Sequence, residues 1–107
     1  MENDVEKLAS EFQKLQSQYQ MVLIQKQQLQ LQTEEAKLAI EELKKSSGKV
    51  YKNVGNIMFE SDKGALAKDL SERQENLDIR LRSLVQQEEK LKGSLEEMKK
   101  KLESVLG

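Results

Sequence analysis

The chain has 107 residues and a formal net charge of −1; 35% of its residues are charged and 4% are aromatic. This balance excludes a compact core of ordinary size, and the interleaved charges offer no basic field for nucleic acid or an anionic membrane surface. The chain has no cysteine and no histidine, so it lacks thiol chemistry, the usual general base and the commonest metal ligand. We therefore expect a cytoplasmic, non-catalytic protein without a cofactor or a metal.

The rest of the composition indicates long helices. Alanine, glutamate, lysine, leucine and glutamine are abundant, and proline is absent. No apolar run approaches the ~20 residues that cross a bilayer. We predict one mainly α domain over residues 1–107, with helices over about 3–46 and 63–106 and a β-hairpin over about 49–60.

The first predicted helix carries a coiled-coil seam. Its positions alternate three and four residues apart, and ten of twelve are apolar. They are Val5, Leu8, Phe12, Leu15, Tyr19, Val22, Lys26, Leu29, Thr33, Ala36, Ile40 and Leu43. We expect the stem of Lys26 to lie along the seam while its ammonium group reaches outward.

A second apolar stripe lies on the opposite face of this helix. Ile24, Leu31 and Leu38 repeat at seven-residue spacing. Scattered surface apolar residues need no special explanation. Contact with another chain is the alternative.

The segment between the helices is typical of a β-hairpin. In Val54-Gly55-Asn56-Ile57, glycine at the first loop position favours a type II′ turn. This turn pairs Val54 with Ile57, Lys52 with Phe59, and Val50 with Ser61. An isolated hairpin is marginal in water and leaves two strand edges unpaired. We therefore expect hairpins of several chains to pair edge to edge; a hairpin folded back on its own helices is the alternative.

The second predicted helix begins after Asp62, a suitable N-cap, and has its own seam. Its positions are Leu66, Leu70, Arg73, Leu77, Leu81, Leu84, Glu88, Leu91, Leu95, Met98, Leu102 and Val105. Two consecutive steps of four, from Arg73 to Leu77 and from Leu77 to Leu81, predict a stutter that locally relaxes the supercoil.

The two helices are predicted to pair with each other. A short hairpin joins them, so they run antiparallel, and opposite seam positions should have residue numbers with a constant sum. Val5 with Val105, Phe12 with Met98, and Ile40 with Leu70 all give 110, whereas Leu43 with Leu66 falls one short. The fold class is therefore an antiparallel two-helix coiled-coil hairpin with a central β-hairpin.

Both chain ends lie at the free end of this coiled coil, where helices fray. If the last turns loosen, seven residues form an adaptable apolar patch, with methionine suited to varied shapes. They are Val5, Leu8, Phe12, Met98, Leu102, Val105 and Leu106. The alternative is ordinary coiled-coil core up to the end.

Helix, hairpin and helix of equal arms, with Val50-Tyr51-Lys52-Asn53-Val54-Gly55-Asn56-Ile57 at the junction, resemble the beta-type subunits of prefoldin. The segment Gln25-Lys26-Gln27-Gln28-Leu29 is also similar to that family. The resemblance covers nearly the whole chain, and the junction carries its specific part.

This resemblance implies an ATP-independent holdase. Two alpha-type and four beta-type subunits would form a hetero-hexamer whose hairpins build a β-barrel platform. The coiled-coil tips would bind unfolded client proteins, here through the seven-residue apolar patch, and deliver them to a group II chaperonin. The subunit-assembly residues would be Val50, Tyr51, Val54, Gly55, Ile57, Met58 and Phe59.

Two other functions remain open from the sequence. A structural spacer or tether would use the hairpin to oligomerise and would have inert tips. A helical-hairpin arm that binds RNA is the other alternative, and the net charge of −1 argues against it.

Overall fold

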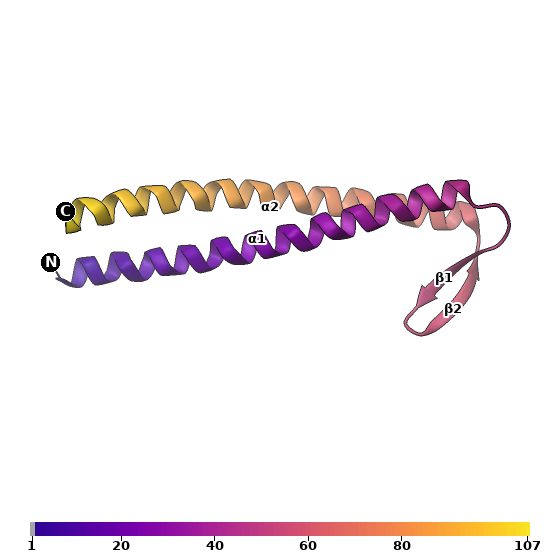
Figure 1. Cartoon of the computed structure of the whole chain (residues 1–107), viewed down its shortest axis with the longest axis horizontal. Coiled ribbons are helices and arrows are strands. Elements are labelled where there is room, and N and C mark those ends of the chain that lie inside the picture. Colours follow the sequence, from indigo (N-terminus) through magenta and orange to yellow (C-terminus); the bar gives the residue numbers. More distant parts are fainter. Residues whose placement is uncertain (1) are drawn as a thin grey trace. The chain divides into compact units, whose positions relative to one another are not determined.

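The computed structural model describes residues 2–107, with side chains from residue 4 onward. Along the chain, two 44-residue helices, α1 (Glu2–Lys45) and α2 (Lys63–Leu106), flank two five-residue strands, β1 (Val50–Val54) and β2 (Ile57–Ser61) (Figure 1). The predicted order of helix, hairpin and helix is thereby confirmed. Neither helix contains a stretch long and apolar enough to span a membrane within residues 2–107.

The structure forms two compact units, a terminal unit and a hairpin unit. In the terminal unit, residues 2–28 of α1 lie beside residues 81–107. The hairpin unit comprises Leu29–Arg80 and contains the end of α1, both strands and the beginning of α2. The two chain ends lie at the same end of the terminal unit (Figure 1), so its helical segments are antiparallel as predicted.

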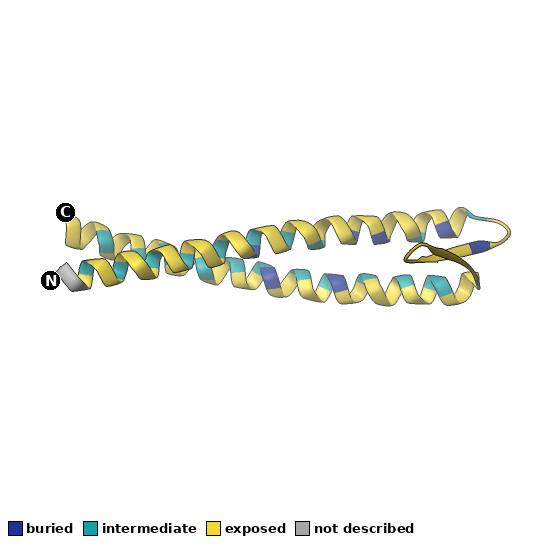
Figure 2. Cartoon of the chain, turned by 90° about the horizontal axis from the view of Figure 1, so that it is seen from below, coloured by how far each residue is buried: buried dark blue, intermediate teal, exposed yellow. Residues whose placement is uncertain are grey.

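The burial pattern confirms the predicted seam of α1. All twelve of its positions are buried or half-buried, including the two polar ones, Lys26 and Thr33. Figure 2 shows buried and half-buried segments recurring among exposed ones along the helices. The Thr33 hydroxyl donates a hydrogen bond of 2.8 Å to the carbonyl of Leu29 one turn earlier. This bond satisfies the buried hydroxyl group without any partner on another element.

The seam of α2 differs from the prediction at two positions, Arg73 and Val105, which are both exposed. Arg73 is exposed, whereas Gln74 and Ala67 are half-buried and Leu77 is buried. With Ala67, Leu70, Gln74 and Leu77 in the seam, steps of three and four alternate regularly, so the predicted stutter is wrong. Both candidates were polar, and hydropathy could not choose between them. Because the regular seam continues, the guanidinium group of Arg73 stays at the surface.

Local hydrogen bonds fix the junctions between helices and strands. The carboxylate of Asp62 accepts a 2.9 Å bond from the backbone N–H of Ala65, which confirms Asp62 as the N-cap of α2. The Lys63 ammonium group donates to the carbonyl of Ser46 at 2.8 Å, joining the start of α2 to the residue after α1. Gly48 has a φ of +102°, in a region that L side chains rarely adopt, and it lets the chain turn from α1 into β1.

The hairpin has the predicted register. Val50 pairs with Ser61, Lys52 with Phe59, and Val54 with Ile57. Gly55 has a φ of +63°, and Asn56 does not have a positive φ. Type I′ needs a positive φ at both loop residues and type II′ at the first alone, so the turn has the predicted type II′ pattern.

A charged pair crosses the seam of the terminal unit. The Lys26 ammonium group donates to the Glu88 carboxylate at 2.7 Å, and the two side chains are 25% and 20% exposed. Antiparallel pairing of the two seams predicts Lys26 one turn away from Glu88, where the opposite charges can offset each other, and the structure brings the two groups into direct contact. The pair fits an apolar seam because each charge neutralises the other where water is partly excluded.

We predict that replacing one member of this pair destabilises the protein more than replacing both. Glu88→Leu should lower the free energy of unfolding by ~1–2 kcal/mol, because it leaves the Lys26 charge half-buried without a partner. The double variant Lys26→Met with Glu88→Leu should match or exceed the wild type. Urea unfolding followed by circular dichroism, at one fixed protein concentration, measures both.

The exposed pair of Lys49 and Glu60 provides the control. Their charged atoms are 3.8 Å apart and their side chains are 71% and 59% exposed. Lys49→Met should therefore leave the free energy of unfolding nearly unchanged. If Glu88→Leu were as mild as this control, the seam pair would contribute nothing to the coiled coil.

Candidate functional site

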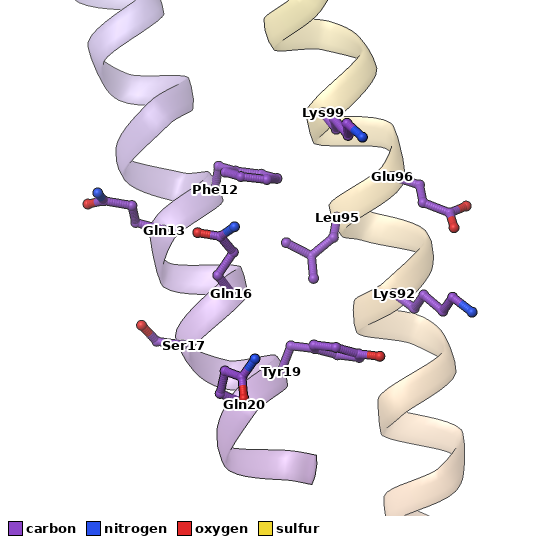
Figure 3. A pocket seen from close by; sticks show the side chains of 10 residues that line it. All are labelled: Phe12, Gln13, Gln16, Ser17, Tyr19, Gln20, Lys92, Leu95, Glu96 and Lys99. Atoms are coloured by element: carbon purple, nitrogen blue, oxygen red, sulfur yellow. The ribbon is translucent and has the colours of Figure 1, made fainter.

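An open cleft of about 930 Å³ lies between the two helical segments of the terminal unit. Phe12 and Tyr19 of α1 point toward α2, and Leu95 of α2 points back between them (Figure 3). The other lining side chains are polar or charged. They are Gln13, Gln16, Ser17, Gln20, Lys92, Glu96 and Lys99.

The residues that flank the seam explain why the cleft stays open. Gln16 on α1 and Lys92 and Lys99 on α2 occupy the positions next to the seam, where long polar side chains turn toward water. Apolar residues there would have closed over Phe12 and Leu95. The rings of Phe12 and Tyr19 therefore remain half-buried and accessible from one side.

Burial is weaker toward the chain ends of the terminal unit. The buried seam residues of this unit are Val22 and Leu84. Five members of the predicted apolar patch are half-buried: Val5, Leu8, Phe12, Met98 and Leu102. The other two are exposed, Val105 by 52% and Leu106 by 72%. The seam thus offers apolar surface at this end that its own two helices do not cover.

Of the seven residues of the predicted apolar patch, only Phe12 lines the cleft. Tyr19 and Leu95 also line it, although the sequence pattern places both in the seam alone. A run of polar residues along one flank of the seam was the signal that could have identified them. The polar flank leaves the seam side chains beneath it uncovered, which a count of seam positions does not reveal.

A smaller groove of about 420 Å³ lies in the same unit, between other residues of the two helices. Met21, Val22 and Leu91 provide its apolar surface. Its remaining lining residues are Gln18, Gln25, Gln87 and Lys90. Apolar seam atoms are thus accessible at a second place in the terminal unit.

The hairpin presents the second predicted surface. Five of its apolar side chains are 52–65% exposed: Tyr51, Val54, Ile57, Met58 and Phe59. Val50 differs, since it is buried in its own unit, and Gly55 lies in the exposed turn. The hairpin therefore contacts its own helices at its base and leaves the rest of its apolar surface without a cover. Such a surface is typical of a subunit interface.

These surfaces are suited to binding. In the described part of the chain, acidic side chains do not gather in groups that could hold a metal ion. The terminal cleft combines aromatic and aliphatic surface with flexible glutamine and lysine side chains. Apolar contact is non-directional, so this arrangement suits partners of varied sequence.

Comparisons with known proteins identify relatives of the chain. A family model described as "Prefoldin subunit" matches residues 6–107. A solved structure, the prefoldin beta subunit from Thermococcus strain KS-1, is similar with a TM-score of 0.86 and 34% sequence identity. That similarity covers 96% of this chain and 92% of the Thermococcus chain.

Two curated archaeal proteins are also similar. Prefoldin subunit beta of Methanocella arvoryzae is 36% identical over 53 residues, which cover 50% of this chain and 42% of that protein. Prefoldin subunit beta of Archaeoglobus fulgidus is 38% identical over 52 residues, which cover 49% and 45%. The matched segment therefore spans less than half the length of these curated relatives.

We predict that the outer part of the terminal unit is less protected from hydrogen exchange than the helices of the hairpin unit. Backbone amides at residues 5–19 and 91–105 should exchange at least about tenfold faster than those at residues 33–43, because weaker side-chain burial lowers the free energy of local opening. Hydrogen–deuterium exchange with mass spectrometry measures this. Equal protection in all three segments would contradict it.

Proposed function

The chain belongs to the prefoldin subunit family, a family of chaperone subunits, and we propose that it is an ATP-independent holdase that binds unfolded polypeptides with its terminal unit. The observation that carries this proposal is the incomplete burial of apolar seam residues at the chain ends. Val105 and Leu106 are exposed, and Phe12 opens into the terminal cleft. An unfolded segment could cover this surface whatever its sequence.

The client-binding surface that we propose has two parts. The first is the predicted patch of Val5, Leu8, Phe12, Met98, Leu102, Val105 and Leu106. The second is the cleft that adds Tyr19 and Leu95. Glutamine and lysine side chains around the cleft can bond to the polar backbone of a client while the rings contact its apolar side chains. A single such site is weak, and several copies acting together would raise avidity.

Assembly is the second part of the proposal. The hairpin would join an alpha-type prefoldin subunit and further beta-type copies in a hetero-hexamer, through Tyr51, Val54, Ile57, Met58 and Phe59. Their exposure and the unpaired strand edges of a two-stranded sheet support this role. Gly55 sets the turn, and Val50 anchors β1 to its own unit. A β-barrel built from several hairpins would remove the edges altogether.

Delivery of the client to a group II chaperonin completes the proposal and is supported by membership of the family. The work of the subunit would be to keep unfolded chains soluble until transfer. The competing function is a spacer or tether, which would assemble in the same way but would hold no client. The seam that continues to Leu102 is compatible with both functions, so the terminal surface must be tested directly.

We predict that polar substitutions at the exposed chain end weaken client holding. The double variant Val105→Gln with Leu106→Gln should reduce affinity for an unfolded client by about tenfold or more per site, because each residue contributes ~1–3 kcal/mol when a client buries it. Both residues are exposed, so the fold should be retained. The assay is suppression of aggregation of a chemically unfolded client protein by the purified assembly.

Ile79→Gln is the matched control, because Ile79 is 63% exposed but belongs to the hairpin unit. This variant should suppress aggregation as well as the wild type does. A wild-type assembly that does not suppress aggregation would favour the spacer. Equal activity of the terminal double variant and the wild type would show that the assigned client surface is wrong.

We also predict that charges on the hairpin prevent assembly without unfolding the chain. Val54 and Ile57 are paired neighbours and more than half exposed, so Val54→Lys with Ile57→Lys should keep the helical content. The sedimentation coefficient of this double variant should fall toward that of smaller species, because unpaired ammonium groups are costly to bury in an interface. Met21→Lys with Ile24→Lys, which changes exposed residues of the terminal unit, should leave assembly unchanged. Unaltered sedimentation of the hairpin variant would exclude the hairpin as the assembly joint.

A further inference from the structure

The hairpin unit contains a polar cleft that the proposed function does not use. It has a volume of about 460 Å³ and is lined by residues of α1, β1 and α2, among them Gln32 and Leu77. Three cationic side chains line it, Lys52 of β1 and Arg73 and Arg80 of α2. All three are exposed in the single chain.

The cations of this cleft lack close partners. Two carboxylates, Asp69 and Glu72, also line the cleft, so its net charge is +1. Across the part of the chain that the structure describes, ion pairs within 4.0 Å join Lys26 to Glu88 and Lys49 to Glu60, and none involves these three cations. Two arginines seven residues apart, about 10 Å along a helix, thus offer two forked donor groups to an incoming anionic surface.

A complementary stripe lies on α1 of the same unit. Leu31, Glu35, Leu38 and Glu42 follow one another at steps of four, three and four residues, so they share one face of the helix. All four are exposed, the two leucines by 61% and 59%. The two glutamates are seven residues apart, the same spacing as Arg73 and Arg80.

We propose that the α1 stripe of one copy of this chain docks against the basic cleft of a second copy. Glu35 and Glu42 then face Arg73 and Arg80 at matched spacing, and Leu31 and Leu38 lose their exposure to water. The stripe and the cleft are formed by different residues of the chain, so each copy carries both surfaces and can offer one to each neighbour. This inference rests on the proposed assembly through hairpins and adds a lateral contact between their helical segments.

Charge and spacing favour a second copy of this chain as the occupant of the cleft. A second copy brings two carboxylates with the right separation, together with apolar surface that needs a cover. Matched charges favour one register and penalise others, because a shifted copy would place like charges together. The contact thus explains both the off-seam leucines of this unit and the exposed position of Arg73 beside its regular seam.

Charge reversal tests the contact on the full chain. The acid-reversed variant is Glu35→Arg with Glu42→Arg, and the base-reversed variant is Arg73→Glu with Arg80→Glu. Each should raise the dissociation constant of the self-assembled chain about tenfold or more, since like charges then oppose each other. Sedimentation velocity over a concentration series measures this. Wild-type assembly should also weaken as salt rises from about 50 to 500 mM.

Mixing the two variants distinguishes a lost charge contact from a misfolded variant. In an equimolar mixture, reversed stripes meet reversed cleft residues and native stripes meet native cleft residues. Assembly should return to within about twofold of the wild type, since the charge pairing is restored. Native mass spectrometry should then find both variants in the same particles. Two variants that remain dissociated when mixed, although circular dichroism shows them helical, would overturn the proposal.

Glu34→Arg with Glu41→Arg provides the matched control. It makes the same charge change on the same helix, one residue before each of the two glutamates of the stripe, and should leave assembly unchanged. A wild-type chain that stays monomeric at about 100 μM contradicts the contact; this is the range in which weak interfaces should associate. Loss of assembly in this control, with assembly retained in both charge-reversed variants, would also contradict the lateral contact.

The test of the lateral contact and the test of the holdase function can fail independently of each other. The reversed charges leave the hairpin strands and the terminal apolar patch intact, and client holding is measured by suppression of aggregation. If the wild type assembles and both reversed variants match it, the lateral contact is wrong while the holdase function stands. If the wild type assembles but holds no client, the holdase function fails and the lateral contact keeps its own test.

Discussion

The thin seam between two helices is the constraint on which the rest of this protein depends. A pair of helices can cover each other along one stripe only, and no described side chain of this chain is fully buried. A compact domain would surround its apolar residues on all sides. Here they remain half-buried along most of the seam, so the chain leaves apolar surface that its own helices do not cover.

Polar residues in the seam give this thin contact its register. The Lys26–Glu88 pair holds its two helical segments in one alignment, because a slip by one turn would separate the charges in a partly dry environment. Thr33 is tolerated in the seam for another reason, since its hydroxyl is satisfied by the backbone of its own helix. An all-leucine seam would bury more apolar area, but it would distinguish one alignment from another less well.

The uncovered surfaces differ in chemistry, and this difference supports a division of roles. The terminal unit offers adaptable apolar surface with a polar surround, which fits partners without a defined sequence. The hairpin unit offers strand edges, exposed β-branched and aromatic side chains, and paired charges at regular spacing. Edges and spaced charges select a particular geometry, which fits a subunit interface. Both the family of the chain and the chemistry of its surfaces therefore indicate a chaperone subunit.

The sequence by itself determined the order of elements, the seam of α1, the hairpin register and the N-cap of α2, and it identified the family. Each depends on residues close together in the chain or on a period repeated over many turns, where local geometry leaves few alternatives. The tertiary structure decided what depends on how neighbouring elements cover one another. It placed Gln74 rather than Arg73 in the seam, brought Lys26 directly onto Glu88, buried Val50 and opened the cleft at Phe12, Tyr19 and Leu95. Side-chain reach across a seam sets these outcomes, and the period of a single helix carries no information about that reach.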